Sequence, residues 1–441
     1  DGCVALLGLD AIYNLGIDIA YAVKHHRHMP IRFIPNQEHL LENRRNNAIE
    51  QYIKQGYDKQ SVVQTCNLSE RVIKEYLLTH PNEYESKPID INSVGVDQTL
   101  SKITQQKIRD ACGLYDVVFA SNTNTLPPPM KGIEPHVFKL KEGAKPVYEP
   151  RPSFPPATAQ AITQWLHWGL KADLVEKASP TCSYASRLIL AAKYKGSTSK
   201  SEPPDGIRVA WAGVRVNDTI IKAVPMYPDA WQQLYKVANT KYKFSADGLK
   251  QYWSVLLSAK AREMTAFWTP EGLFQFKRLV MGTKNAATIA QNAYTSALHN
   301  MLNPRSFPNI ANFADDFLGG ANSEEALVEV FTDFLKMCKE ARITLNPEKV
   351  QVSFQKEQFY GMTIDNGKIE SAQHNIDPVI NMTYPKNRAE LRSCMGVLNQ
   401  FKHFLPNYAR ADSPAAILNN LTSPKAEWEF TDTHRAAMDA L

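Results

Sequence analysis

The alternation of hydrophobic and polar positions changes along the 441-residue chain. Residues 38–80 are polar, with two or three short amphipathic runs. After residue 153 a helix is predicted, because two prolines precede four apolar residues at helical spacing, Ile162, Trp165, Leu166 and Leu170. Next come an apolar strand ending near Lys193, the turn-rich stretch STSKSEPPDG and a second strand, IRVAWAGVRV. This order predicts a hairpin with basic residues near its tip.

The composition is that of a globular protein. Hydrophobic residues make up 44% and charged residues 22%, which disfavours disorder, collagen-like repeats and a disulfide scaffold. The six cysteines form no C-x-x-C pair, so we expect free thiols in a reducing compartment. No stretch of about 18 residues is free of charged side chains, so the sequence predicts no membrane span. The net charge of +5 permits a polyanionic partner without requiring one.

The N-terminal third has little recognisable chemistry. Without an initiator Met, the chain is expected to be cut from a longer product. His25, His26 and His28 are candidate metal ligands, but they lack partners at ligand spacing, so a solvated basic turn is favoured. Residues 38–80 suit a helical linker, with a small DNA-binding helix-turn-helix as the alternative. LPPPM at 126–130 is expected to be a stiff spacer and a domain boundary.

Carboxylates at two positions suggest metal chemistry. Asp247 follows a short predicted strand, and Asp315 and Asp316 lie in the apolar run NIANFADDFLGG. Carboxylates on a hairpin tip can converge with one from another strand and bind two Mg²⁺ ions about 3.5 to 4 Å apart. The alternative is that the Asp-Asp pair only stabilises a turn through side-chain to backbone bonds.

A series of motifs follows in order from about residue 135 to 441: PHVFKLKEGAKPV, the two strands of the predicted hairpin, FSADGLKQYW, TAFWTPEGLFQFKRLVMGTKNA, FADD, ITLNPEK, FYGMTI and LRSCMGVLNQFKHFLPNYA. This order resembles the reverse transcriptases of LTR retrotransposons and retroviruses, most closely the gypsy-like branch, in which the hairpin strands belong to the fingers. The resemblance implies that Asp247 and Asp315 are catalytic ligands of two Mg²⁺ ions, with Mn²⁺ able to substitute, and that Asp316 is a less direct neighbour. FADD has Phe313 where the family usually has Tyr.

The resemblance also implies a nucleotide site. Tyr252 is similar to the aromatic gate under the sugar, with a palm core position as the alternative. Lys193 and Arg208 resemble the cations that bind the triphosphate, although Arg208 also suits an exposed strand. Met281 and Gly282 resemble the residues that start a helix beneath the template and nucleotide. Lys349 resembles the lysine that protonates the leaving pyrophosphate, with an ordinary surface lysine as the alternative.

Two further groups resemble duplex-binding parts of the family. Phe359, Tyr360 and Gly361 match the primer grip. The helix NRAELRSCMGVLNQFKHFL begins with N-x-x-E capping-box spacing and resembles the thumb. There Arg388, Arg392 and Lys402 are expected to contact phosphates, with an ordinary solvated face as the alternative.

The chain departs from the family at a few positions. Ala212, Gly213 and Val214 stand where Asp-Tyr-Arg is usual, and Ala287 replaces a proline, whereas Asn217 is retained. These differences concern the fingers more than the metal site.

The sequence therefore predicts an α+β right-hand polymerase. The expected division is a truncated retropepsin-like end (1–30) without protease activity, a helical and Pro-rich linker (31–130), fingers and palm with a small antiparallel sheet (131–368), and the thumb and start of the connection (369–441). The expected reaction is RNA- or DNA-templated addition of dNTPs to a primer 3′-OH. The expected setting is a pol polyprotein with protease, ribonuclease H and integrase, in cytoplasmic virus-like particles. A catalytically inactive, nucleic-acid-binding or particle protein is the alternative.

Overall fold

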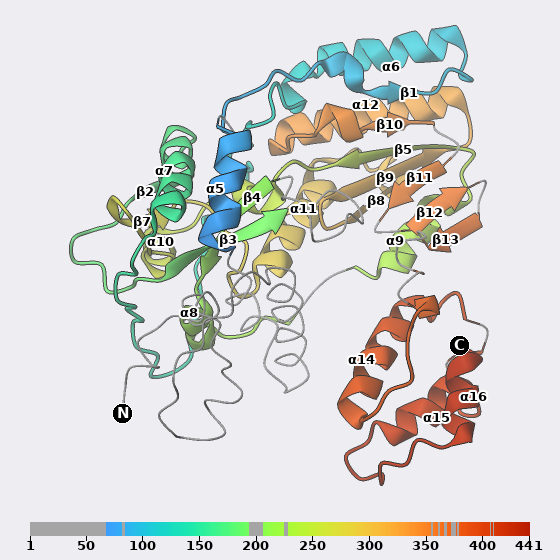
Figure 1. Ribbon diagram of the computed structural model, residues 1–441. Coiled ribbons are helices and arrows are strands. Elements are labelled where there is room, and N and C mark those ends of the chain that lie inside the picture. The colour runs from blue at the N-terminus through green and yellow to red at the C-terminus, as the bar shows by residue number, and fades with distance from the viewer. Residues whose placement is uncertain are drawn as a thin grey trace.

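The computed structural model describes residues 68–441 apart from 82–83, 194–205, 225–227, 354–355, 360–361, 366–367, 372–375, 377–378, 406 and 409. This part of the chain forms a mixed helix and sheet body followed by a cluster of helices at the C-terminus (Figure 1). The predicted α+β class is confirmed. The expected retropepsin-like end and its histidines lie outside the described residues.

A five-stranded sheet forms the centre of the body. Its order is β1, β10, β5, β9, β8, with the bounds Gly95–Val96 (β1), Tyr242–Asp247 (β5), Ile310–Phe313 (β8), Asp316–Ala321 (β9) and Gln351–Val352 (β10). Neighbouring strands are antiparallel except for β1 and β10, which run parallel. The sheet is therefore antiparallel where β5, β9 and β8 adjoin, as predicted, with one parallel strand added at its edge.

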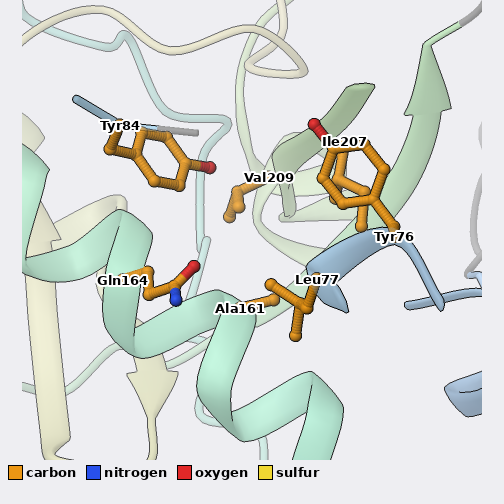
Figure 2. A pocket seen from close by; sticks show the side chains of 7 residues that line it. All are labelled: Tyr76, Leu77, Tyr84, Ala161, Gln164, Ile207 and Val209. Atoms are coloured by element: carbon orange, nitrogen blue, oxygen red, sulfur yellow. The ribbon is translucent and has the colours of Figure 1, made fainter. Parts of the chain in front are cut away.

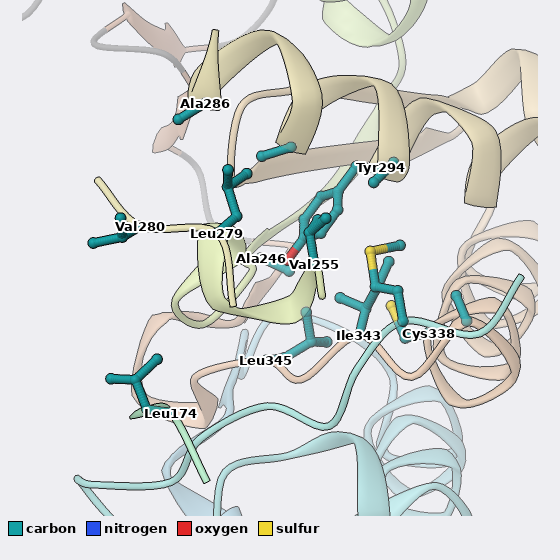
Figure 3. Packing of buried hydrophobic residues seen from close by; sticks show 14 of the residues in the cluster. Leu174, Ala246, Val255, Leu279, Val280, Ala286, Tyr294, Cys338, Ile343 and Leu345 are labelled. Atoms are coloured by element: carbon teal, nitrogen blue, oxygen red, sulfur yellow. The ribbon is translucent and has the colours of Figure 1, made fainter. Parts of the chain in front are cut away.

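Helices cover both faces of this sheet. On one face, Phe334 lies 5.1 Å, between ring centroids, from both Phe244 and Phe317. On the other, Leu234 and Leu318 share a second core. The helices involved are α12 (Glu324–Ala341) on the first face, with α6 (Lys102–Leu114) and α11 (Ala286–Met301) packed against it, and α9 (Ala230–Ala238) on the second. Figure 3 shows part of the first core around Tyr294, between the sheet and its helices.

The predicted hairpin is confirmed, but its second strand ends at Ala212, and the last residues predicted for that strand, from Val214 on, begin a helix instead. Strands β3 (Arg187–Lys193) and β4 (Gly206–Ala212) pair antiparallel along their whole length. A three-stranded sheet and four helices complete this part of the body: β2 (Val175–Lys177), β7 (Gly272–Phe276), β6 (Phe267–Thr269), α5 (Glu70–Thr79), α7 (Pro156–Lys171), α8 (Val214–Thr219) and α10 (Ala259–Met264). The predicted helix after residue 153 is α7, but Leu170 is 40% exposed, so the buried stripe ends before it.

Helix α5, from the expected linker, packs on α7. The Glu70 carboxylate accepts hydrogen bonds from the backbone N–H groups of Ala157 and Thr158 and so caps the start of α7. Ile73 and Tyr76 are buried. Figure 2 shows the small pocket beside this contact, lined by Tyr76, Leu77, Tyr84, Ala161, Gln164, Ile207 and Val209. The described end of the linker is therefore part of the folded body.

The proline-rich segment at 126–130 is also part of the body. The backbone N–H of Met130 donates to the Ser254 carbonyl at 2.9 Å, and the Arg278 guanidinium donates to the Pro127 carbonyl. Upstream of it, β1 joins the central sheet and α6 packs on α12. The expected boundary at LPPPM therefore does not separate two structural layers, because the chain on both sides contributes to the same sheet and helices.

The C-terminal helices have a hydrophobic core of their own. They are α14 (Arg388–Leu398), α15 (Pro414–Leu421) and α16 (Asp432–Asp439), and they follow a small sheet of β11 (Lys356–Phe359), β12 (Met362–Asp365) and β13 (Lys368–Ser371). The predicted cap of α14 is confirmed, since the Asn387 side chain accepts from the Glu390 backbone N–H at 2.9 Å. The ring of Trp231, on α9, lies 4.4 Å from that of His403 and 5.1 Å from that of Phe404, between centroids.

Candidate active site

Three carboxylates lie at one end of the central sheet. Strands β8 and β9 are joined by a two-residue turn of Ala314 and Asp315, and Asp316 is the first residue of β9. Asp247, the last residue of β5, pairs directly with Asp316 across the two strands. The backbone N–H of Gly248 donates to the Asp315 carbonyl at 2.7 Å. The strand register therefore brings together the aspartates that the sequence places far apart.

Asp247 forms an ion pair with Lys349. Lys349 lies in the 3-10 helix η5 (Pro347–Lys349), and its Nζ donates to Asp247 Oδ2 at 2.9 Å. The Asp247 side chain is only 18% exposed. Burial raises the pKa of Asp247, partly offset by the Lys349 hydrogen bond and charge, and the Asp315 charge raises it further.

The lysine responds to the same group of charges. Burial alone lowers the pKa of Lys349, but the bond to Asp247 and the charges of Asp247, Asp315 and Asp316 outweigh burial, so the pKa is raised above its ordinary value. Lys349 therefore stays protonated and lies within the field of all three carboxylates. This position differs from that of an isolated surface lysine.

A buried amide network holds the turn between β8 and β9. The backbone N–H of Ala314 donates to Gln291 Oε1 at 2.6 Å. The Ala314 carbonyl accepts from Gln251 Nε2 at 2.8 Å and from Asn312 Nδ2 at 3.0 Å. Sequence reasoning missed these three amides, because glutamine and asparagine have no distinctive spacing here. The only signal was that Gln251 and Asn312 lie close in sequence to the aspartate motifs, whereas Gln291 lies in α11, away from both.

A tyrosine packs directly behind the carboxylates. A Cβ atom at Gly248 would lie 2.7 Å from the Tyr294 hydroxyl oxygen and 2.8 Å from its Cε2. Tyr294 is fully buried, which raises its pKa well above the ordinary value, and the nearby charges of Cys338, Asp315 and Asp247 act in the same direction. The backbone of Gly248 can follow Asp247 so closely only because it has no side chain.

The donor chemistry of this site suits hard divalent cations. Carboxylate oxygens are the ligands that Mg²⁺ and Mn²⁺ prefer. Within the described part of the chain, no three His, Cys, Asp or Glu side chains are grouped tightly enough to hold a metal ion as they stand. Instead, Asp247 binds the Lys349 ammonium. The three aspartates therefore suit a divalent cation by their carboxylate donors and by the strand register that brings them to one end of the sheet.

The expected nucleotide-binding residues lie on several elements. Lys193 and Arg208 are on the paired strands β3 and β4, and Arg208 is exposed. Met281 is 52% exposed. Gly282 has a φ of 97°, a conformation that glycine adopts without strain. Asn217 Nδ2 donates to the Gly282 carbonyl at 2.6 Å, which gives this retained asparagine a structural role.

The departure from Asp-Tyr-Arg has a packing consequence. The Trp211 ring lies over Gly213, where a Cβ atom would come within 1.9 Å of the indole. Trp211 is 4% exposed. A tyrosine at position 213 could not coexist with this arrangement, so Trp211 and Gly213 form a matched pair.

Tyr252 lies in the 3-10 helix η3 (Gln251–Ser254), which follows β5 and Asp247. It is half-buried and packs against the main core. Its neighbour Trp253 turns toward Trp168, with ring centroids 5.6 Å apart, and the Lys250 ammonium lies over both indoles. The two tryptophans and the lysine therefore form a packed group beside Tyr252, whose role as a gate stays a prediction.

The residues predicted to bind the duplex lie on β11 and on or beside the C-terminal helices. Phe359 ends β11, whereas Tyr360 and Gly361 lie outside the described residues. Arg388 donates to the carbonyls of Leu421 and Ala426, and Arg392 donates twice to the Thr422 carbonyl, at 2.6 and 3.0 Å. Both arginines therefore bind backbone around the end of α15. Lys402 is exposed.

Residues 212–364 match the family described as reverse transcriptase (RNA-dependent DNA polymerase). The match contains Asp247, Asp315 and Asp316, so the three carboxylates lie within the part of the chain that is similar to this family. The predicted family resemblance is confirmed.

The chain is similar to LTR retrotransposon polyproteins of fission yeast. It is 24% identical over 324 residues to the transposon Tf2-3 and Tf2-7 polyproteins of Schizosaccharomyces pombe, covering 74% of this chain. It spans only 23% of the length of those relatives.

Solved structures of foamy viral protease-reverse transcriptase share the fold. The complex with double-stranded DNA has a TM-score of 0.60 and 18% identity, covering 85% of this chain and 70% of that one. The complex with an RNA/DNA hybrid has a TM-score of 0.58 at 18% identity, covering 85% of this chain and 45% of that one.

Four of the cysteines, Cys112, Cys182, Cys338 and Cys394, are free thiols. No helix of the described residues is long and apolar enough to span a membrane.

Proposed function

We propose that this chain is the DNA polymerase part of a retroelement pol polyprotein. In this proposal it adds dNTPs to a primer 3′-OH on an RNA or DNA template and releases pyrophosphate. The observation that carries the proposal is the convergence of Asp247 and Asp316 in one strand register, with Asp315 in the adjoining turn. The reverse transcriptase family match over the same residues supports it.

In the proposed mechanism, Asp247 and Asp315 are the principal metal ligands and Asp316 supports them. Two Mg²⁺ ions, or Mn²⁺ in their place, would supply charge stabilisation to the phosphoryl transfer when bound between these carboxylates. The half-buried position of Asp247 strengthens its electrostatic interactions, because nearby protein replaces water. The strands hold the backbones of Asp247 and Asp316 in register before substrate arrives, which reduces the cost of orienting them.

Lys349 is proposed to act as a proton donor from Nζ to the leaving pyrophosphate. Its contact with Asp247 Oδ2 supports a position at the reaction centre. Its raised pKa keeps the proton available at neutral pH. Exchange of the Asp247 contact for a phosphate oxygen would bring this ammonium against the leaving group that it protonates.

Substrate binding is proposed to involve the hairpin of β3 and β4. Lys193 and Arg208 would bind the triphosphate, and Tyr252 would contact the sugar. Met281 and Gly282 would lie beneath the template and nucleotide. Phe359, with Tyr360 and Gly361, would grip the primer.

The C-terminal helices are proposed to track the duplex as a thumb, starting near residue 369. Lys402 is the best phosphate-binding candidate of the three predicted basic residues, since Arg388 and Arg392 bind carbonyls within the thumb. Protease, ribonuclease H and integrase segments of the same polyprotein are the proposed partners. The similarity to retrotransposon polyproteins supports virus-like particles in the cytoplasm as the setting.

Primer extension on poly(rA)/oligo(dT) with Mg²⁺ or Mn²⁺ tests the proposal. The wild type should incorporate dTTP, whereas Asp247→Asn and Asp315→Asn should lose extension but keep most of their primer-template affinity, because they remove metal ligands and not phosphate contacts. Asp316→Asn should have a smaller effect. Asp110→Asn, an exposed aspartate on α6, is the matched control and should extend normally.

The competing function is an inactive nucleic-acid-binding or particle protein. Duplex binding by the wild type without incorporation under either metal would favour that alternative. Extension by Asp247→Asn at most of the wild-type rate would instead refute the assignment of the metal ligands.

A further inference from the structure

The turn that carries Asp315 has an unusual backbone. Ala314 has a φ of 53°, in the left-handed region, and Asp315 does not have a positive φ. A two-residue hairpin in which only the first turn residue has positive φ follows the type II′ pattern, whose first position favours glycine. An alanine there is strained, because its Cβ atom clashes with the neighbouring backbone. Such an outlier directly before two candidate metal ligands points to a functional constraint.

Three buried amides compensate for this strain. Both backbone polar groups of Ala314 are bonded, the N–H to Gln291 and the carbonyl to Gln251 and Asn312. The amides also bind one another, since Gln291 Nε2 donates to Asn312 Oδ1 at 2.8 Å. Asn312 Nδ2 in addition donates to the Asp316 carbonyl at 3.0 Å. The network therefore holds the backbone on both sides of Asp315.

Burial makes these bonds restrictive. Gln291, Asn312 and Gln251 are 1%, 2% and 5% exposed, so water cannot replace a lost partner. They come from three elements, α11, β8 and η3, which fixes the turn relative to the helix behind it and to the turn that carries Tyr252. A change in the turn's conformation would leave several buried polar groups without partners.

We propose that Gln291, Asn312 and Gln251 are positioning residues that impose the left-handed conformation on Ala314 and thereby set the divalent-metal affinity of Asp315 and its neighbours. This inference rests on the proposed function, since it concerns the same carboxylates. The three amides act through the backbone and do not themselves touch substrate or metal.

Gln291→Met is the central test variant. Methionine has a similar length and tolerates buried positions, but it cannot accept from the Ala314 N–H or donate to Asn312. Gln275→Met is the matched control, because Gln275 is also buried, at 9% exposed, and donates to Glu176 in a different sheet. Loss of a buried amide bond is common to both variants, whereas loss of support for the turn is specific to Gln291→Met.

The primary measurement is Mn²⁺ binding to the full chain, followed by electron paramagnetic resonance of free Mn²⁺. Gln291→Met should weaken binding by about 10- to 100-fold, the range typical for partners that orient metal ligands. Gln275→Met should match the wild type. Primer extension should show the same difference as a higher Mn²⁺ requirement, with little change in the KM for dNTP.

Rescue by Ala314→Gly separates positioning from general stability. Glycine adopts a positive φ without strain, so Ala314→Gly in the Gln291→Met background should restore most of the Mn²⁺ affinity. A merely structural loss would leave the double variant no better than Gln291→Met. Equal Mn²⁺ affinities for Gln291→Met and Gln275→Met, or no rescue by glycine, would overturn the inference.

The two proposals fail in different ways. A wild type that does not extend a primer, but whose Mn²⁺ affinity falls in Gln291→Met, would refute the polymerase function and leave the positioning role standing. A wild type that extends primers while Gln291→Met binds Mn²⁺ normally would refute only the positioning role. Absence of Mn²⁺ binding by the wild type would overturn both.

Discussion

Gly248→Ala should act as a steric wedge behind the candidate active site. The new Cβ atom would lie 2.7 Å from the Tyr294 hydroxyl oxygen, 2.8 Å from Cε2 and 3.2 Å from Cζ. Tyr294 is 1% exposed and stacks on Phe317 with ring centroids 5.5 Å apart, so it has no free space in which to move. The backbone of Gly248 must therefore shift.

The expected cost follows from two opposing effects. Overpacking of a dense core costs about 1 to 3 kcal/mol. Replacing glycine by alanine also restricts the unfolded chain, which stabilises the folded state by about 0.4 to 1 kcal/mol where the backbone conformation is compatible. The φ of Gly248 lies outside the left-handed region, so this second effect applies. The net loss in free energy of unfolding should be about 1 to 2 kcal/mol.

Urea unfolding followed by circular dichroism measures this loss, and Gly113→Ala is the control. Gly113 lies in α6, and a methyl group added there would meet nothing within 4 Å, so that substitution should stabilise the helix by about 0.5 to 1 kcal/mol. Opposite signs for the two variants are therefore expected. Tyr294→Phe should partly rescue Gly248→Ala, because it removes the nearest clashing atom.

Under the proposed function, the same substitution should also impair catalysis. The Gly248 N–H donates to the Asp315 carbonyl, so a backbone shift at Gly248 displaces the carboxylates from one another. Extension should fall even under conditions where the variant remains folded. A Gly248→Ala protein as stable as the wild type, or as stabilised as Gly113→Ala, would refute the packing argument.

Three other predictions concern a buried lysine, sugar selection and the thumb. Burial lowers the pKa of Lys250 from 10.5 to about 8, so the unfolded chain holds this proton more tightly than the folded protein does. The free energy of unfolding should therefore rise with pH between these two values. Lys250→Met should remove that rise in urea titrations. Tyr252→Val should increase kcat/KM for rNTP relative to dNTP by roughly 5- to 150-fold if the ring excludes a 2′-hydroxyl, and an unchanged ratio in the folded variant would exclude the gate. In the proposed thumb, Lys402→Ala should lower the salt dependence of duplex affinity by about one unit of slope without loss of stability. Arg392→Ala should instead lower the melting temperature of the helices, because the Thr422 carbonyl loses two hydrogen bonds.

The sequence predicted the parts of the fold that depend on local pattern or motif order. The hairpin of β3 and β4, the helix α7 and the cap of α14 follow from periodicity, turn residues and capping spacing. The convergence of Asp247 with the Asp315 turn followed from the family resemblance, because strand pairing across the sheet is not visible in spacing alone.

Other features depend on three-dimensional contacts that local pattern does not encode. The prolines at 126–130 have the composition of a spacer, but Arg278 and Ser254 bind their backbone within the body. Arg388 and Arg392 carry the charge expected of phosphate contacts, but they lie beside carbonyls around the end of α15. Gln291 lies in the helix α11, where hydrophobic periodicity assigns no role to a single glutamine. Its role is visible only in the folded structure, where it accepts the hydrogen bond from the Ala314 N–H.

The separate core of the C-terminal helices implies that heat should inactivate this protein in stages. Among the described residues, that core contains seven buried ones, Leu391, Met395, Leu398, Ala415, Leu418, Leu421 and Ala437, whereas the main core extends through most of the body. Cooperative units with few buried contacts open at lower free energy than the rest of a molecule. Warming should therefore unfold these helices first. Under the proposed function, the protein would then still catalyse extension but would be distributive, releasing its primer after each short synthesis.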